Sequence, residues 1–69
     1  MLKISRTPEG YIEVEETLMN ATQTQKRFWY YDLANKVQSS NGQKGEKPNR
    51  PMTLEALSWV TKHYLPKCS

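Results

Sequence analysis

Apolar and polar residues alternate along the first part of the chain, at residues 2–4 (Leu-Lys-Ile) and again at residues 12–14 (Ile-Glu-Val). A period of two is typical of a strand with one buried face. The Pro-Glu-Gly string at residues 8–10 lies between the two stretches and favours a turn. The pattern therefore predicts a β-hairpin over residues 1–15. Two strands are marginal alone, so the hairpin needs a helix to cover it.

A helical pattern follows the hairpin. Asn20 stands three residues before Gln23, a spacing typical of the capping box at the start of a helix. Serine, asparagine and glycine at residues 39–42 favour its end. The sequence thus predicts a long helix over residues 21–38. On a helical wheel, one apolar face collects Tyr30, Leu33, Ala34 and Val37, with Trp29 at its margin.

Two aromatic residues do not fit that face. Phe28 falls almost opposite it, and Tyr31 lies nearer to Phe28 than to the centre of the face. One interpretation is that the helix is covered on both sides, by the hairpin and by the last helix. The other is that these residues are exposed and mark a partner surface or a seam between two copies of the chain.

Residues 39–52 are rich in glycine, lysine, asparagine and proline and have no large apolar residue before Met52. Such a stretch contributes little to a core, so we expect a mobile basic loop. Loops of this length are usually functional or disordered. Thr53 is a suitable N-cap and Pro66 a suitable stop, which together predict a short C-terminal helix over residues 53–65.

The C-terminal helix has a predicted buried side and an outer side. Trp59 and His63 are on the outer side, four residues apart, so their side chains can touch. Trp59 is either packed under the loop or the hairpin, or exposed as a candidate hot spot for binding. The predicted buried residues are Leu54, Leu57, Val60, Tyr64 and Leu65.

These elements predict an α+β fold in one domain over residues 1–69: a hairpin packed on a long helix, a basic loop and a short helix. A chain of this size buries only about 60% of its unfolded surface, so its core is small. Cys68 is the only cysteine and His63 the only histidine. Neither a disulfide nor a zinc site can be built within one chain, and a homodimer is one way to add stability.

The net charge of +3 is unevenly distributed. Residues 1–19 hold two basic and four acidic residues, whereas residues 20–69 hold eight basic and three acidic residues. A net charge of +5 after residue 19 suits a polyanionic partner such as nucleic acid, although a mildly basic surface can also serve solubility alone.

The residues that catalysis requires are scarce. One histidine and one distant cysteine do not supply a closed metal site, and no glycine-rich phosphate loop is present. Glu13 and Glu15 fall on the outer face of a strand, where carboxylates are usually solvated. We therefore expect no enzyme activity, catalytic residue, metal or cofactor. With no apolar run long enough to cross a bilayer and no signal-peptide pattern, we expect a cytoplasmic protein that does not bind membranes.

Two functions remain from the sequence. The first is a small DNA- or RNA-binding accessory or regulatory protein, in which the helix and the basic loop contact phosphates. The second is a phage-like inhibitor or adaptor of the kind encoded by mobile elements, which docks on a host protein through exposed aromatic residues. Self-association is compatible with either. The candidate nucleic-acid contacts are Lys26, Arg27, Lys44, Lys47 and Arg50. The candidate partner contacts are Phe28, Tyr31, Trp59 and His63.

Overall fold

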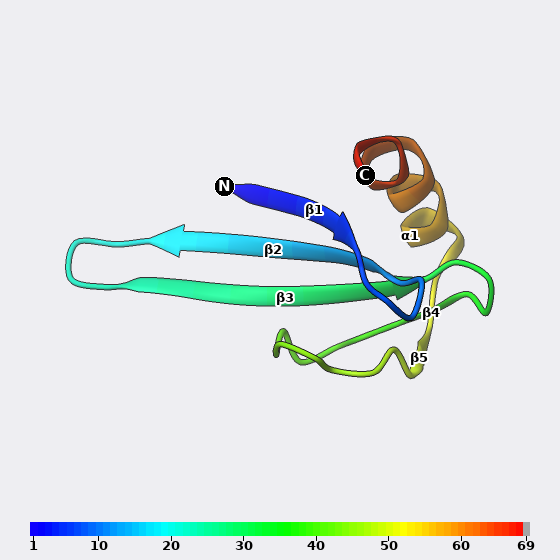
Figure 1. The fold of residues 1–69 in the computed structure, drawn as a ribbon, viewed down its shortest axis with the longest axis horizontal. Helices are drawn as coiled ribbons and strands as arrows, with labels where there is room; N and C mark the ends of the chain where they lie inside the picture. The colour runs from blue at the N-terminus through cyan, green and yellow to red at the C-terminus, as the bar shows by residue number, and fades with distance from the viewer. Residues whose placement is uncertain (69) are drawn as a thin grey trace.

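Five antiparallel strands lie side by side in chain order, and a helical segment follows them (Figure 1). The computed structural model describes residues 1–68. The expected α+β class is confirmed, and the C-terminal helix lies close to its expected position. The strands are β1 (Leu2–Arg6), β2 (Ile12–Met19), β3 (Thr24–Asp32), β4 (Val37–Gln38) and β5 (Arg50–Pro51). The helical segment comprises the α-helix α1 (Leu54–Trp59), the π-helix η1 (Val60–Tyr64) and the 3₁₀-helix η2 (Leu65–Lys67).

The N-terminal hairpin is confirmed. β1 pairs with β2 over its full length. In the turn, the Thr7 N–H donates to the Tyr11 carbonyl and the Gly10 N–H donates to the Thr7 carbonyl, both at 2.9 Å. Gly10 has a φ of +94°, which a residue with a side chain rarely adopts, so the glycine fits this turn. The second strand is longer than expected, because it continues past residue 15 to Met19.

The long helix predicted over residues 21–38 is wrong. The stretch contains the whole of β3, a turn and β4. β3 pairs with β2 along eight residue pairs, from Ile12↔Tyr31 to Met19↔Thr24. Pairing between strands distant in sequence overrides local helix signals, since a half-buried strand face favours aromatic residues. The N-terminal hairpin therefore pairs with a third strand at the place in the chain where a covering helix was predicted.

The aromatic run at residues 28–31 is explained by strand geometry. Alternate side chains of a strand project to opposite faces. Phe28 and Tyr30 thus share one face of the sheet, whereas Trp29 and Tyr31 share the other and pack against the core. The helical stripe that grouped Tyr30 with Ala34 is wrong, because Ala34 is exposed in the turn between β3 and β4.

The chemistry predicted for Asn20 is present in a different element. Its Oδ1 accepts hydrogen bonds from the N–H groups of Thr22, at 3.1 Å, and Gln23, at 2.8 Å. These are the bonds that an asparagine N-cap also makes, but here they close the turn between β2 and β3. The Asn20 N–H donates to the Gln23 carbonyl at 3.1 Å and completes the turn.

The core lies between the sheet and the helical segment. Its four buried residues are Ile12, Val14, Met52 and Val60. Thr53 is confirmed as the N-cap, since its Oγ1 accepts a hydrogen bond of 3.0 Å from the Ala56 N–H. The cap places the helix so that Val60 faces the sheet.

Leu54 does not belong to the buried side of the helix, which corrects the sequence prediction. Its side chain is 85% exposed, whereas Val60 is 1% exposed. At 3.6 residues per turn, six positions separate the two residues by about 120° around the axis. Leu57, Tyr64 and Leu65 do pack against the core, as predicted.

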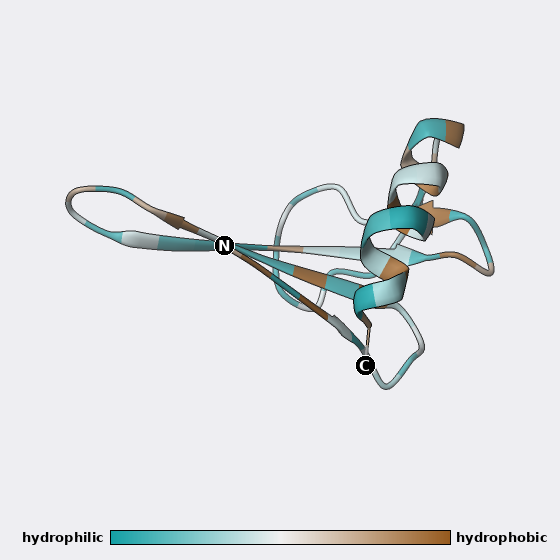
Figure 2. Ribbon diagram, turned by 90° about the horizontal axis from the view of Figure 1, so that it is seen from above, coloured by the Kyte–Doolittle hydropathy of each residue, from teal (hydrophilic) through white to brown (hydrophobic). Residues whose placement is uncertain are grey.

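The hairpin formed by β2 and β3 extends well beyond the rest of the sheet (Figure 1). No other element lies over its far end in either view (Figure 2). Every residue from 18 to 27 is exposed, including the apolar Leu18 and Met19. We call residues 18–27 the arm. The core does not extend into it.

Tyr31 generates a prediction about alkaline stability. Burial, with smaller contributions from the nearby Tyr64 and Glu16, raises the pKa of Tyr31 to about 12. Because this folded-state pKa lies above the ordinary value of 10.0, the stability that Tyr31 contributes is complete below pH 10 and is lost as the pH rises through 12. Tyr31→Phe removes the titrating group. We expect the urea midpoint of the variant to fall less than that of the wild type between about pH 9 and about pH 11. An equal fall in both proteins would contradict the assignment.

Candidate nucleic-acid interface

The arm carries a basic residue on each of its faces. The pairing Glu16↔Arg27 places Arg27 on the face of the sheet that also bears the helix, and Thr17↔Lys26 places Lys26 on the opposite face. Both residues are exposed. No aspartate or glutamate occurs between residues 17 and 31. The arm is therefore a two-stranded ribbon that carries two cations and no carboxylate, together with the exposed apolar side chains of Leu18 and Met19.

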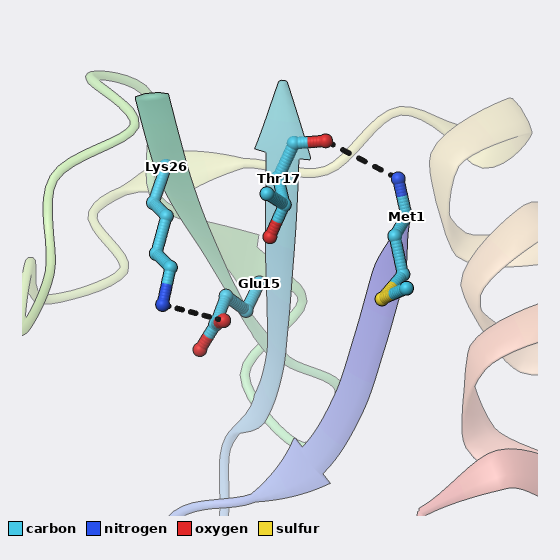
Figure 3. Close-up of polar contacts among 4 residues, drawn as sticks. All are labelled: Met1, Glu15, Thr17 and Lys26. Atoms are coloured by element: carbon cyan, nitrogen blue, oxygen red, sulfur yellow. Dashed lines mark hydrogen bonds and ion pairs between the residues drawn. The ribbon is translucent and has the colours of Figure 1, made fainter. Parts of the chain in front are cut away.

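Lys26 has one acidic neighbour at the base of the arm. Its Nζ lies 3.5 Å from the Glu15 carboxylate, with the lysine side chain 55% exposed (Figure 3). Exposed ion pairs of this kind contribute little to stability and are weakened by salt. The ammonium group thus stays accessible to a phosphate.

The start of the loop after β4 approaches β3 closely beside Arg27. The Phe28 N–H donates to the Gly42 carbonyl at 3.0 Å. A Cβ built on Gly42 would stand 3.3 Å from the Trp29 ring and 3.6 Å from the Arg27 Cδ. With a φ of +73° as well, Gly42 is the residue type that this contact accommodates.

Tyr30 anchors the next part of the loop on the face of the sheet opposite the helix. Its side chain is 4% exposed, and its hydroxyl donates to Glu13 Oε2 at 2.7 Å and accepts from the Gly45 N–H at 2.8 Å. We call Tyr30, Glu13 and Gly45 the Tyr30 cluster, which sequence reasoning missed. The alternation of β2 already set Glu13 on the face opposite Ile12, but only the pairing with β3 brings Tyr30 to it.

A second carboxylate fixes the tip of the loop. The backbone and side-chain amides of Asn41 each donate to Glu46 at 2.9 Å. The fold of the loop is thus set by Tyr30 and Glu46, although it has no regular secondary structure between β4 and β5.

The loop places two of its three predicted nucleic-acid contacts on the same face as Lys26. Lys44 Nζ lies 5.6 Å from the centre of the Phe28 ring, which is a cation–π distance. Lys47 borders a hollow of about 300 Å³ beside Tyr30. Arg50 belongs to the last strand of the sheet, β5, and is not part of this group. Lys26, Lys44 and Lys47 thus share one face of the sheet with the carboxylates of Glu13, Glu15 and Glu46, and we call these three lysines the basic group. Arg27 lies on the opposite face.

The four aromatic residues predicted to contact a partner separate into two sets. Phe28 lies half-buried under Lys44, and Tyr31 packs against the Tyr64 ring at 5.9 Å between centroids. Trp59 is 54% exposed, and its ring lies 4.1 Å from that of His63, so the predicted contact between them is confirmed. Only this second set, on the helix, offers an open aromatic surface.

The part of the chain that the structure describes holds no group of three or more His, Cys, Asp or Glu residues placed to bind a metal ion. Within residues 1–68, no helix has the length and apolar character needed to cross a membrane. No protein-family model, curated protein or solved structure matches the chain.

The Tyr30 cluster predicts a stability effect that isolates one hydroxyl. In Tyr30→Phe, the Gly45 N–H loses its acceptor and Glu13 loses a donor, which should lower the free energy of unfolding by about 1–3 kcal/mol. Urea denaturation followed by circular dichroism measures the change. Tyr11→Phe is a matched control, because Tyr11 lines the same hollow outside the cluster. The control should stay within about 0.5 kcal/mol of the wild type. Equal losses in both variants would show that the cluster does not anchor the loop.

Proposed function

We propose that the protein binds nucleic acid through the arm, and that its target is duplex DNA. The observation that carries this proposal is an exposed two-stranded ribbon with basic residues on both faces and no acidic residue along its length. Lysine and arginine side chains bind phosphates and thereby release the counterions condensed on the DNA. This release supplies much of the affinity of nucleic-acid-binding proteins.

The shape of the arm favours a groove over a flat surface. Two paired strands lie about 4.8 Å apart, and the major groove of B-form DNA, about 12 Å wide, admits a two-stranded ribbon. Cations on both faces suit a site with phosphates on either side. The deep, narrow major groove of A-form RNA does not admit protein side chains in the same way.

The basic group beside the arm extends the contact surface. Lys44 and Lys47 lie on the same face as Lys26, where they can reach phosphates next to the groove. The Tyr30 cluster holds this loop against the sheet, so the position of the lysines is set before binding. Lower conformational freedom in the free protein favours affinity.

A cytoplasmic location fits this proposed role. The unpaired Cys68 suits a reducing compartment. We propose an accessory or regulatory protein without catalytic activity, since the features that support the proposal are binding features only.

Salt dependence provides the test. We expect the double variant Lys26→Gln/Arg27→Gln to bind a fluorescein-labelled DNA duplex more weakly than the wild type. The slope of log affinity against log salt should become shallower by about 1.8, or about 0.9 for each lost phosphate contact. Fluorescence anisotropy titrations at several salt concentrations measure both quantities.

A matched control uses the helix at the other end of the molecule. Lys62→Gln removes one exposed cation from η1 and should leave the slope unchanged. A wild-type protein that fails to bind duplex DNA even at low salt would overturn the proposal. An equal effect of the control and the double variant would move the interface away from the arm.

A further inference from the structure

The helical segment lies at the end of the molecule opposite the arm (Figure 1). A hollow of about 260 Å³ separates β1 from the helix, and a second of about 410 Å³ lies along the helix. Trp59 and His63 line both hollows. Leu2 on β1 is 49% exposed and Leu54 on α1 is 85% exposed. The two hollows together form one surface, which we call the helix-edge groove.

β1 borders this groove as the outermost strand of the sheet. The backbones of Met1 and Thr17 exchange two hydrogen bonds. The Thr17 N–H donates to the Met1 carbonyl at 2.9 Å, and the Met1 amino group donates to the Thr17 carbonyl at 3.2 Å, the contact drawn in Figure 3. In an antiparallel pair, alternate residues direct their N–H and C=O groups toward the partner strand. Lys3 therefore bonds toward β2, and Leu2 and Ile4 direct their backbone groups to the side away from β2.

We propose that the helix-edge groove binds an extended acidic segment of another protein, which adds to β1 as a further strand. Backbone hydrogen bonds to Leu2 and Ile4 would hold the segment, and every second side chain would enter the hollow beside Trp59. This mode of recognition combines main-chain bonds for affinity with side-chain pockets for specificity. Aromatic residues such as Trp59 commonly dominate the binding energy of such surfaces.

The positive charge of the helix-edge groove favours an acidic segment as its partner. Lys62 and Lys67 line the groove, and Glu55 is the one acidic residue among the residues that line the two hollows. Lys3 adds an exposed cation on the other face of β1, where the alternate side chains of an added strand would meet it. A second copy of the chain would bring two such sets of lysines together, and like charges across an edge are unfavourable. An acidic partner instead pairs with them.

The test uses a fluorescein-labelled peptide with alternating valine and glutamate, Val-Glu-Val-Glu-Val-Glu-Val, and a second peptide with lysine in place of glutamate. Leu2→Pro removes one outward N–H and no bond to β2, so an edge strand tolerates it. Leu2→Ala is the matched control that keeps the N–H. Circular dichroism and urea denaturation verify the fold of both variants.

We expect the acidic peptide to bind and the basic one not to bind. Leu2→Pro should bind about tenfold more weakly than Leu2→Ala, as for one lost hydrogen bond at an interface. Hydrogen exchange at the Leu2 and Ile4 amides should slow when the acidic peptide is bound. Failure of the acidic peptide to bind overturns the proposal, and so does equal binding by the two variants. A dimer in analytical ultracentrifugation that Leu2→Pro dissociates would assign the edge to a second copy. None of these outcomes depends on nucleic-acid binding by the arm.

Discussion

The register between β2 and β3 is the constraint on which the rest of the structure depends. Side chains alternate with a period of two, so a slip of one residue would exchange the faces of a whole strand. In the observed register, Ile12 and Val14 face the helix, and Glu13 meets Tyr30 on the other side. The first pair builds the core, and the second anchors the loop that carries Lys44 and Lys47. One pairing thus sets both the fold and the arrangement of the basic group.

Local sequence signals predicted elements whose structure is decided locally. The turn ending at Gly10 and the Thr53 cap depend on neighbouring residues, and the Trp59–His63 contact depends on helical spacing, so all three were predictable. The Asn20–Gln23 signal is common to helix caps and turns, and a run of aromatic residues fits either a two-faced helix or a strand. Pairing with β2 decides that these residues form a turn and a strand. The paired residues of β2 are too distant in sequence for a local pattern to include them.

The same limit applies to the candidate site. Charge alone identified Lys26, Arg27, Lys44 and Lys47 as nucleic-acid contacts. Their arrangement depends on the strand faces and on the hydrogen bond from Gly45 to Tyr30, neither of which follows from composition. The exposure of Leu54 and Trp59 likewise depends on which side of the helix meets the sheet. The sequence therefore predicted which residues are candidate contacts, but not which face of the sheet or helix each of them occupies.

The central claim is that the arm serves binding and not stability. Replacing residues 17–26 with Asn-Gly would join Glu16 to Arg27 by a two-residue turn suited to hairpins. The measurement is the urea midpoint of this shortened protein together with its affinity for duplex DNA. We predict a midpoint close to that of the wild type, because no core residue lies in the deleted segment and only the two Met1–Thr17 hydrogen bonds at the end of β1 are lost. We also predict much weaker DNA binding, because Lys26 and the ribbon that would enter the groove are removed. A folded variant with wild-type affinity, or one that no longer folds, would contradict the claim.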